Sequence, residues 1–306
     1  MAKSILLTGS NGLLGQKIVH RLAGLPHINL LAVGRGVNRH PLRAGYAYQN
    51  VNLTNSEELN ALFDSFKPQY VIHTAAMTQV DACETKRDLC DAINVDAVKD
   101  IIACCEKYKS HLVHISTDFI FDGASGPYQE TDTPNPVNYY GVSKLKAEQA
   151  LLESNISFAI LRTMLLYGVT PGMSRSNILL WAKKSLEEGQ TIRVVNDQVR
   201  CPTLAEDLAN ASISAVMREA KGIFHISGAE LMTIHDLVLR IAKFWKLNEE
   251  LVQTTTSDAL NQAARRPPRT GFILLKAQTQ LDYRPHSLEQ GFAQVDRQLS
   301  ELAVEI

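Results

Sequence analysis

The sequence predicts an α/β protein in which a doubly wound parallel sheet is completed by a smaller C-terminal α/β domain. In the first half of the chain, short apolar runs typical of buried strands alternate with helical patterns. Three closely spaced glycines follow the first apolar run directly, as a tight strand-to-helix turn requires. The alternation ends near Pro171. We therefore place an approximate boundary between 1–168 and 169–306, and we allow the chain to cross back over it.

The expected elements follow from the apolar periodicity. Strand-like runs fall at 4–8, 28–33, 46–51, 70–74, 111–116 and 158–162, and helical patterns fall at 56–66, 86–108 and 140–154. Right-handed connections between parallel strands then put helices on both faces of the sheet. Ligands of such sheets lie beyond the carboxyl ends of the strands, so functional residues are expected just after each strand. Later helices are expected at 178–188, 205–217 and 234–245, with short strands near 191–195 and 223–227.

Composition and charge exclude several classes of protein. Of the 306 residues, 45% are hydrophobic and 21% are charged, which is ordinary for a globular protein. The net charge of −1 argues against a nucleic-acid-binding surface. No apolar run approaches the roughly 18 residues of a membrane span, and the N-terminus enters a strand without the pattern of a signal peptide. We expect a cytoplasmic protein with neither nucleic-acid nor membrane partners.

The five cysteines favour a structural interpretation. Their number is odd, and no C-x-x-C spacing occurs among them. Three of them lie in helical patterns, where a thiol behaves as a small apolar side chain. The sequence therefore predicts buried thiols, and neither a metal site nor a disulfide.

The stretch SILLTGSNGLLG, residues 4–15, has the order of a dinucleotide-binding unit: a strand, a glycine turn and a helix. Gly9 lets the chain turn, Gly12 lets a pyrophosphate touch the backbone, and Gly15 lets the helix pack on the strand. The free N–H groups and the dipole at the helix N-terminus would hold the phosphates. This pattern predicts a Rossmann domain that binds its cofactor through Gly9, Asn11, Gly12, Leu13, Leu14 and Gly15.

The residues after the second strand favour NADP over NAD. An NAD-binding unit places an acid about twenty residues past the glycines, to bond the ribose 2′-hydroxyl. Here the first acidic residue of the chain is Glu57, whereas Arg35 follows the second strand. An arginine without a nearby acid suits a 2′-phosphate, although solvated arginines are the alternative, which we prefer for Arg43. We expect NADPH as the cofactor and leave NADH open.

Other strand ends supply further candidates for the cofactor. Small residues after the fourth strand would let the backbone approach it, although alanines are also common fillers at strand ends. Within a long helical pattern, Asn94 is a poor helix former, so it either bends or caps the helix or bonds a neighbouring loop. We assign to the cofactor site, from these regions, Asn52, Leu53, Ala75, Ala76, Met77 and Asn94.

The chemistry is densest after the fifth strand. Thr117 ends that strand, and Tyr140 and Lys144 follow at i and i+4 on one helix face. An ammonium beside a phenol favours the phenolate and lowers the tyrosine pKa from its usual value of about 10. Such a set performs general acid–base work on a carbonyl or carbinol beside a nicotinamide. We expect all three residues to be catalytic, with Tyr140 and Lys144 also contacting the cofactor.

Along nearly its full length the chain resembles the extended short-chain dehydrogenase/reductases, and among them the dTDP-4-dehydrorhamnose reductases. The motifs that carry this resemblance are TGSNGLLG, AAMTQVDACE (75–84), STDFIFDG (116–123), YYGVSKLKAE (139–148), RTMLLYG (162–168), NDQVRCPT (196–203) and RRPPRTGFIL (265–274). The resemblance implies that Thr117, Tyr140 and Lys144 are catalytic, with Tyr140 as the proton donor. It also implies that Asn94 supports the lysine through water.

Related dehydratases and epimerases can be compared with this chain. Dehydratases of the superfamily follow the catalytic threonine with Asp-Glu, but Asp118 is followed here by Phe119, so elimination lacks its base. Epimerases usually retain NAD, which the missing acid disfavours. We therefore expect an NADPH-dependent oxidoreductase that reduces the 4-keto group of a nucleotide-linked deoxysugar, of the dTDP-4-dehydro-L-rhamnose to dTDP-L-rhamnose type. The alternatives are a nucleotide-sugar epimerase and a non-catalytic NADP-binding subunit similar to the β subunit of methionine adenosyltransferase.

Two departures from the reductase pattern bear on the sugar. Leu165 stands where those reductases have a tryptophan, and Arg200 stands where a glycine often precedes Pro-Thr. The basic loop 265–269 would attract a diphosphate, or is simply solvated. The residues that we assign to the nucleotide-sugar substrate are Thr78, Val80, Asp118, Leu165 and Arg266. The identity of the sugar and nucleotide stays open, as does a homodimer.

Overall fold

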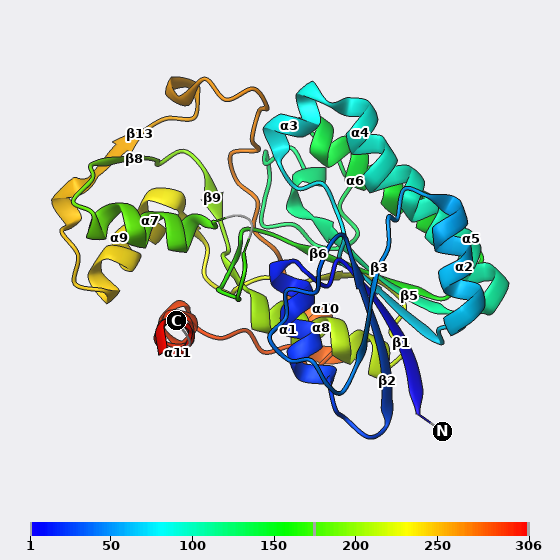
Figure 1. Cartoon of the computed structure of the whole chain (residues 1–306). Helices are drawn as coiled ribbons and strands as arrows, with labels where there is room; N and C mark the ends of the chain where they lie inside the picture. The colour runs from blue at the N-terminus through cyan, green and yellow to red at the C-terminus, as the bar shows by residue number, and fades with distance from the viewer. Residues whose placement is uncertain (1, 174–175, 305–306) are drawn as a thin grey trace.

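A computed structural model describes residues 2–173 and 176–304 and is built on one seven-stranded sheet (Figure 1). The strand order is β11-β6-β5-β4-β1-β2-β3, and every pair of neighbours is parallel. The strands are β1 (Lys3–Thr8), β2 (Ile28–Gly34), β3 (Ala47–Asn50), β4 (Tyr70–His73), β5 (His111–Thr117), β6 (Phe158–Thr163) and β11 (Gly222–His225). The order reverses between β1 and β4, which is where a doubly wound sheet binds its ligand.

Helices cover both faces of this sheet, which confirms the predicted fold class. On one face lie α1 (Leu13–Leu22), α8 (Ala205–Met217) and α10 (Leu275–Gln280). On the other lie α2 (Ser56–Phe66), α5 (Ala97–Tyr108) and α6 (Tyr139–Leu152). Alternate residues of each strand enter the two apolar cores, so that Leu7 faces α1 and Leu6 faces α2.

The helical pattern predicted over 86–108 is interrupted in the structure. After α3 (Val80–Thr85), α4 (Arg87–Asp91) passes into a π-helical turn (Ala92–Asp96) that leads into α5. Such single turns often mark functional sites. The buried Asn94 lies within this turn, so the polar residue that disfavoured a regular helix is found where the helix is irregular.

A second, smaller unit has its own apolar core. It contains α7 (Ile178–Glu187), α9 (Ile234–Phe244) and α11 (Leu288–Val304), and β8 (Ile192–Val195) paired in parallel with β13 (Val252–Thr255). Two-stranded pairs form its link to the large sheet: β7 (Leu166–Tyr167) with β10 (Thr203–Leu204), and β9 (Val199–Arg200) with β12 (Met232–Thr233). Short 3-10 turns complete the chain at Asp118–Ile120, Glu249–Leu251 and Asp258–Leu260.

The chain crosses back to the large sheet after the second unit has begun. Helix α8 packs against α1, and β11 pairs with β6 at the edge of the sheet. A linear division at residue 168 therefore separates the two units only in part. In Figure 1 the segment between β13 and α10 returns from the second unit across the carboxyl ends of the strands.

Candidate functional site

The glycine turn has the geometry that its sequence predicts. Gly9 adopts a φ of +71°, and a Cβ there would lie 2.6 Å from the backbone nitrogen of Ala75. A Cβ on Gly15 would lie 2.3 Å from the carbonyl oxygen of Gly9, so the helix could not pack as closely with any other residue. The turning role of Gly9 and the packing role of Gly15 are therefore confirmed. Gly12 caps α1 without a side-chain bond, and the first turn of α1 contains no acid.

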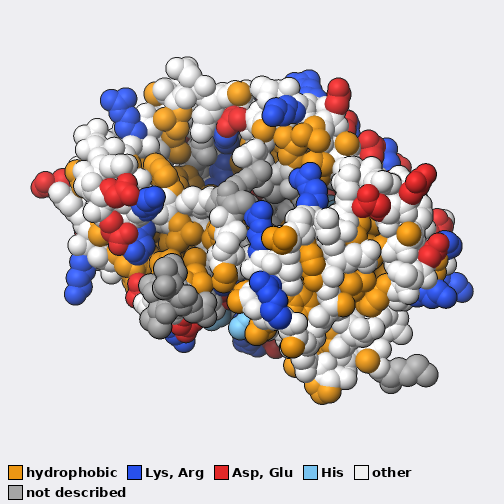
Figure 2. Space-filling view, in the orientation of Figure 1, with side chains coloured by type: hydrophobic (Ala, Val, Ile, Leu, Met, Phe, Trp, Pro, Cys, Tyr) orange, Lys and Arg blue, Asp and Glu red, His pale blue; other side chains and the backbone are white. Residues whose placement is uncertain are grey.

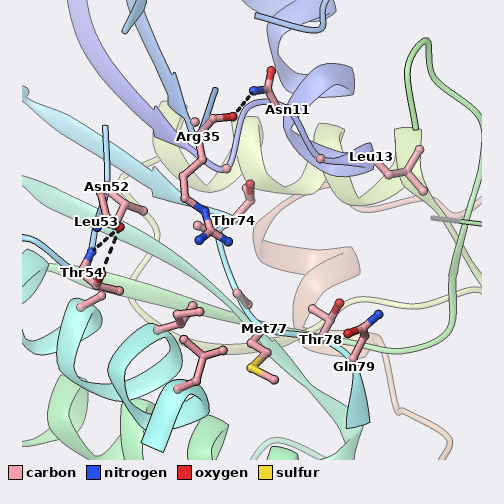
Figure 3. A pocket seen from close by; sticks show the side chains of 18 of the residues that line it. Asn11, Leu13, Arg35, Asn52, Leu53, Thr54, Thr74, Met77, Thr78 and Gln79 are labelled. Carbon is pink, nitrogen blue, oxygen red and sulfur yellow. Dashed lines mark hydrogen bonds between the residues drawn. The ribbon is translucent and has the colours of Figure 1, made fainter. Parts of the chain in front are cut away.

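A cavity of about 600 Å³ opens beside this turn, at the carboxyl ends of β1, β2 and β4. Figure 3 shows the Arg35 side chain reaching into it from the end of β2. Figure 2 shows a hollow between the two units with Lys and Arg side chains around it. The predicted residues that line the cavity are Gly9, Asn11, Gly12, Leu13, Arg35, Asn52, Leu53, Ala75, Ala76, Met77 and Thr78.

Sequence reasoning missed several residues of the cavity. Lys86 adds a cation, and Asn177 brings the second unit to the wall, because it caps α7 and donates to the carbonyl of Gly168 at 2.7 Å. An asparagine before an apolar helical run is a recognisable cap, but only tertiary structure places it here. Of the remaining predicted cofactor residues, Leu14 is buried in the core, and Asn94, Tyr140 and Lys144 lie outside the cavity lining.

The side chain of Asn11 organises the loop that carries Arg35. Its Nδ2 donates to the carbonyls of Arg35 and Val37, and its Oδ1 accepts from the backbone N–H of Arg39 at 2.9 Å. The amide is thus used within the protein, and what Asn11 offers to the cavity is mainly backbone. Arg35 and Arg39 are both exposed and line the same cavity, so the predicted cationic edge consists of two arginines.

The proposed catalytic hydroxyls lie together at the end of β5. Thr117 is hydrogen-bonded to the hydroxyl of Tyr140, which projects from the first turn of α6. Asn138 begins that helix by accepting from the N–H of Gly141 at 2.9 Å. Met77 lines the cavity and belongs to a small buried cluster, with Cys83 and Cys90, against which Tyr140 packs, so this catalytic end is near the cavity. Burial raises the tyrosine pKa, and the Thr117 hydrogen bond opposes that rise.

Lys144 lies one turn after Tyr140 on α6 and is 2% exposed. Its Nζ is 3.0 Å from Nε2 of His114, a buried histidine of β5 that the sequence analysis did not single out. Burial lowers the lysine pKa to about 8, and the carboxylate of Glu148 opposes this shift. The ammonium is therefore directed to an imidazole, and the pKa of Tyr140 is not lowered as the i, i+4 spacing predicted.

The side chain of Asn94 is hydrogen-bonded to the loop that lines the cavity. Its Oδ1 accepts from the N–H of Met77 at 2.8 Å, while its Nδ2 donates to the Met77 carbonyl and to Ser143 Oγ. The side chain thus binds the neighbouring loop, one of the outcomes that its poor helix propensity allowed. It fixes the strand-end segment that lines the cavity.

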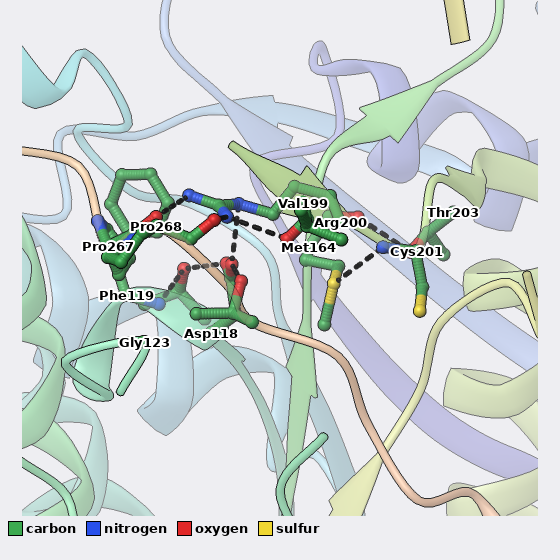
Figure 4. Close-up of polar contacts among 12 residues, drawn as sticks. Asp118, Phe119, Gly123, Met164, Val199, Arg200, Cys201, Thr203, Pro267 and Pro268 are labelled. Carbon is green, nitrogen blue, oxygen red and sulfur yellow. Dashed lines mark hydrogen bonds and ion pairs between the residues drawn. The ribbon is translucent and has the colours of Figure 1, made fainter. Parts of the chain in front are cut away.

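Asp118 is held within the protein by a buried ion pair (Figure 4). Its Oδ2 lies 3.4 Å from Nε of Arg200 and accepts a hydrogen bond from Thr270, and both charged side chains are 3% exposed. Arg200 also donates to the carbonyls of Val199, Pro267 and Pro268. Burial raises the pKa of Asp118 and lowers that of Arg200, and the ion pair opposes both shifts.

The loop predicted to bind a diphosphate is tied to the catalytic helix region. Both terminal nitrogens of Arg266 pair with Asp81 of α3, at 2.7 and 2.6 Å, and hold the pKa of Asp81 below its usual value. Asn138 donates to the carbonyl of Arg265. Residues of the segment 264–270 thus contact α3, α6, Asp118 and Arg200. The positive charge of Arg266 is neutralised by the carboxylate of Asp81.

The remaining predictions concern Val80, Leu165, the cysteines, a metal site and a membrane span. Val80 begins α3 half-buried, and Leu165 adopts a left-handed φ of +40° between β6 and β7. All five cysteines are buried, as predicted. Within 2–173 and 176–304, no cluster of acidic, histidine and cysteine side chains could hold a metal ion, and no helix is long and apolar enough to cross a membrane.

Comparisons with known proteins identify the family. Residues 3–300 match the family described as the RmlD substrate binding domain, and the chain belongs to that family, which confirms the resemblance inferred from its motifs. Over 268 residues it is 32% identical to methionine adenosyltransferase 2 subunit beta of Bos taurus, covering 86% of this chain and 78% of that one. It is 29% identical to the probable low-salt glycan biosynthesis reductase Agl14 of Haloferax volcanii, covering 96% and 98%.

The fold is also that of a solved reductase. The crystal structure of dTDP-4-dehydrorhamnose reductase from Bacillus anthracis in complex with NADP matches with a TM-score of 0.83 and 24% identity, over 97% of this chain and 100% of that one. At this identity the match establishes the architecture, including the doubly wound sheet and the second unit.

Proposed function

We propose that this member of the RmlD family is an NADPH-dependent reductase that acts on the 4-keto group of a nucleotide-linked deoxysugar. The observation that carries the proposal is the pair of interacting hydroxyls of Thr117 and Tyr140, with a buried lysine one turn along α6 and with Tyr140 packed against the cluster that contains the cavity residue Met77. Cofactor, proton donor and carbonyl must meet in one place for such a reduction, and the closeness of Tyr140 to the cavity lining supports this arrangement.

The residues present fit a dinucleotide. Gly9 and Gly15 leave no room for a Cβ, and the N-terminus of α1 is open, so backbone N–H groups of the turn would hold the pyrophosphate. Arg35 and Arg39 would attract the 2′-phosphate, and no acid precedes Glu57 to accept a 2′-hydroxyl. NADPH is therefore the expected cofactor, with NADH as a weaker substitute.

When bound, NADPH supplies the hydride for the keto carbon. Tyr140 carries the proton for the carbonyl oxygen, because burial raises its pKa and keeps the phenol protonated near neutral pH. Thr117 interacts with that phenol, and its hydroxyl, which here donates to Asp118 Oδ1 at 3.2 Å, would turn to the same carbonyl oxygen. Lys144, which carries positive charge below about pH 8, would hold a hydroxyl of the cofactor rather than lower the pKa of Tyr140.

Reduction is supported over dehydration by the surroundings of Tyr140. The ring of Phe119 packs edge-on against the ring of Tyr140, with centroids 6.0 Å apart, at the position where a dehydratase requires a second carboxylate. Asp118 is occupied by Arg200 and Thr270. Position 119 therefore has no carboxylate, and the carboxylate of Asp118 is already paired, so neither residue can act as the base in elimination.

A second candidate is a non-catalytic NADP-binding subunit. The identity of 32% to methionine adenosyltransferase 2 subunit beta favours it. The ion pair with Arg200 also favours it, because it makes Asp118 unavailable to a substrate. The chain keeps the Thr117, Tyr140 and Lys144 set that catalysis requires, so we place the reductase first.

The deciding experiment follows NADPH absorbance with a panel of 4-keto sugars linked to dTDP, UDP and GDP. A reductase consumes NADPH with at least one of them, and Tyr140→Phe abolishes that consumption. NADPH binding without turnover on any member of the panel would instead support the subunit. An epimerase would interconvert nucleotide sugars without net NADPH consumption.

A further inference from the structure

A row of buried polar residues crosses the sheet beneath Lys144. Thr8 of β1 pairs in register with His73 of β4, and His73 pairs in register with His114 of β5. All three face the same side as Leu6, Val71 and Leu112, which belong to the apolar core under α2, α5 and α6. Because side chains alternate along a strand, these three positions face an apolar core, where apolar residues are expected. Three polar residues in one row there require an explanation.

The row is connected from end to end. Thr8 Oγ1 lies 2.7 Å from His73 Nδ1, the rings of His73 and His114 stack with centroids 5.4 Å apart and planes 15° apart, and His114 Nε2 lies 3.0 Å from Lys144 Nζ. None of the four side chains has more than 2% of its surface exposed. The row therefore ends on the proposed catalytic lysine.

The protonation states of His114 and Lys144 determine which of them donates the hydrogen bond. Burial and the nearby lysine charge hold the pKa of His114 well below its usual value, so the imidazole is neutral. An ammonium can only donate, so Nε2 accepts and the ring proton lies on Nδ1. That Nδ1, like Nε2 of His73, has no partner within the residues that the structure describes. Burying such groups costs about 1–3 kcal/mol each, a cost that packing alone does not require.

We infer that His114 is a positioning residue of the proposed reduction: a neutral imidazole, backed by His73 and Thr8, that holds the Lys144 ammonium in place. With one N–H of the ammonium accepted by His114, two remain for the cofactor and for the Tyr140 side of the site. The side-chain amide of Asn94 bonds Met77 and Ser143, so the direct side-chain contact to the ammonium comes from His114. The inference rests on the proposed function, because the cofactor contact of Lys144 is part of that proposal.

Other groups near Lys144 must be considered in any pH titration. Glu148 lies one turn farther along α6 and is paired with Arg162 of β6 at 2.7 Å, and Cys90 of α4 is a second acidic neighbour. His73 and His114 face the lysine from the sheet. The pKa of Cys90 is lowered to about 7, chiefly by its hydrogen bond with Cys83, so this thiol also changes charge in the range studied. The titrations below are therefore compared with the same titrations in Cys90→Ser, which leaves Lys144 as the group that changes charge near pH 8.

The first test observes the contact directly. In the full chain, the ¹⁵N shift of His114 Nε2 is followed by NMR from pH 6.5 to 9.5, a range of about three units around the lysine pKa of about 8. We expect an inflection near pH 8 that disappears in Lys144→Met. An identical titration in the two proteins would overturn the inference, and this measurement requires no new variant at position 114.

The second test measures its consequence through NADPH dissociation constants, read from NADPH fluorescence over the same pH range. We expect affinity to weaken as Lys144 loses its charge. In His114→Leu the midpoint should move down by about one pH unit, because loss of a hydrogen bond to a charged group disfavours the charged form roughly tenfold. His114→Gln, which retains an acceptor, should restore the midpoint. His111→Leu, a buried histidine of the same strand on the opposite face, is the matched control.

The outcomes separate the inference from the proposed function. Equal midpoints in His114→Leu and the wild type would overturn the positioning role. A flat wild-type profile would overturn the cofactor contact of Lys144 and the inference with it. A chain that shows the expected profiles but reduces no keto sugar would contradict the proposed function alone.

Discussion

At the glycine turn, much of the cavity wall is half-buried or exposed, whereas at the catalytic end Thr117, Asp118 and Lys144 are buried and bonded to other residues of the chain. The first end therefore offers backbone groups and cations to a ligand. The second offers few unused polar atoms, and its behaviour depends on contacts between distant segments. Substitutions at the cavity should change affinity for the cofactor, and substitutions at the catalytic end should change rate and stability.

The largest effect is expected for Tyr140→Phe. Loss of the proton donor should reduce kcat by about 10²–10⁴-fold while NADPH still binds. The adjacent Tyr139→Phe is the control, because the hydroxyl of Tyr139 bonds Asp91 on the outer side of the helix at 2.8 Å. Steady-state kinetics of both variants would measure the contrast, and unchanged turnover in Tyr140→Phe would contradict the assignment.

Arg200→Leu should lower the stability of the fold, because Arg200 belongs to the buried catalytic end. Removing one partner leaves Asp118 buried without its countercharge, and breaking such pairs costs about 3–5 kcal/mol of unfolding free energy. Urea unfolding of the variant would measure the loss. Arg193→Leu, at an exposed position of β8, should change little. Adding Asp118→Asn to Arg200→Leu should recover part of the loss, and a purely additive double variant would argue against the ion pair.

Arg35→Ala should change only the affinity of the cavity at the glycine turn for the cofactor. Its charge-assisted contact with the 2′-phosphate is expected to be worth about tenfold to a hundredfold in affinity. KM for NADPH should rise by that factor while KM for NADH stays nearly constant. Arg43→Ala, an exposed arginine of the same acid-free stretch that does not line the cavity, is the control. Equal changes for both cofactors would refute the phosphate contact.

Near neutral pH, the smallest effect is expected from the buried histidine His73, and it grows as the pH falls. Burial lowers the pKa of His73 from 6.5 to about 3, so the unfolded chain binds more protons than the folded chain between these values. Stability should therefore fall as the pH falls below 6.5, by up to about 1.4 kcal/mol per pH unit for this group. His73→Asn should reduce that slope in pH-dependent unfolding, whereas the exposed His27→Asn should leave it unchanged.

The same contrast explains how much could be predicted from the sequence. Gly9, Gly15 and the acid-free stretch act through local backbone geometry and charge, which neighbouring residues reveal. The ion pair of Arg200 with Asp118 and that of Arg266 with Asp81 join segments far apart in the chain, and neither residue type indicates its partner. The i, i+4 spacing placed Tyr140 and Lys144 on one helix correctly, but the strand facing that helix decides where the ammonium points.

The register of Thr8, His73 and His114 also links correct folding to a competent site. Because side chains alternate along a strand, a slip of one residue would bring Leu7, Ile72 or Val113 into the row instead. Such a misaligned sheet would leave the lysine charge against hydrocarbon, which is costly. The residues that form the site therefore also destabilise a sheet with the wrong strand register. A chain folded with such a register would be both unstable and inactive.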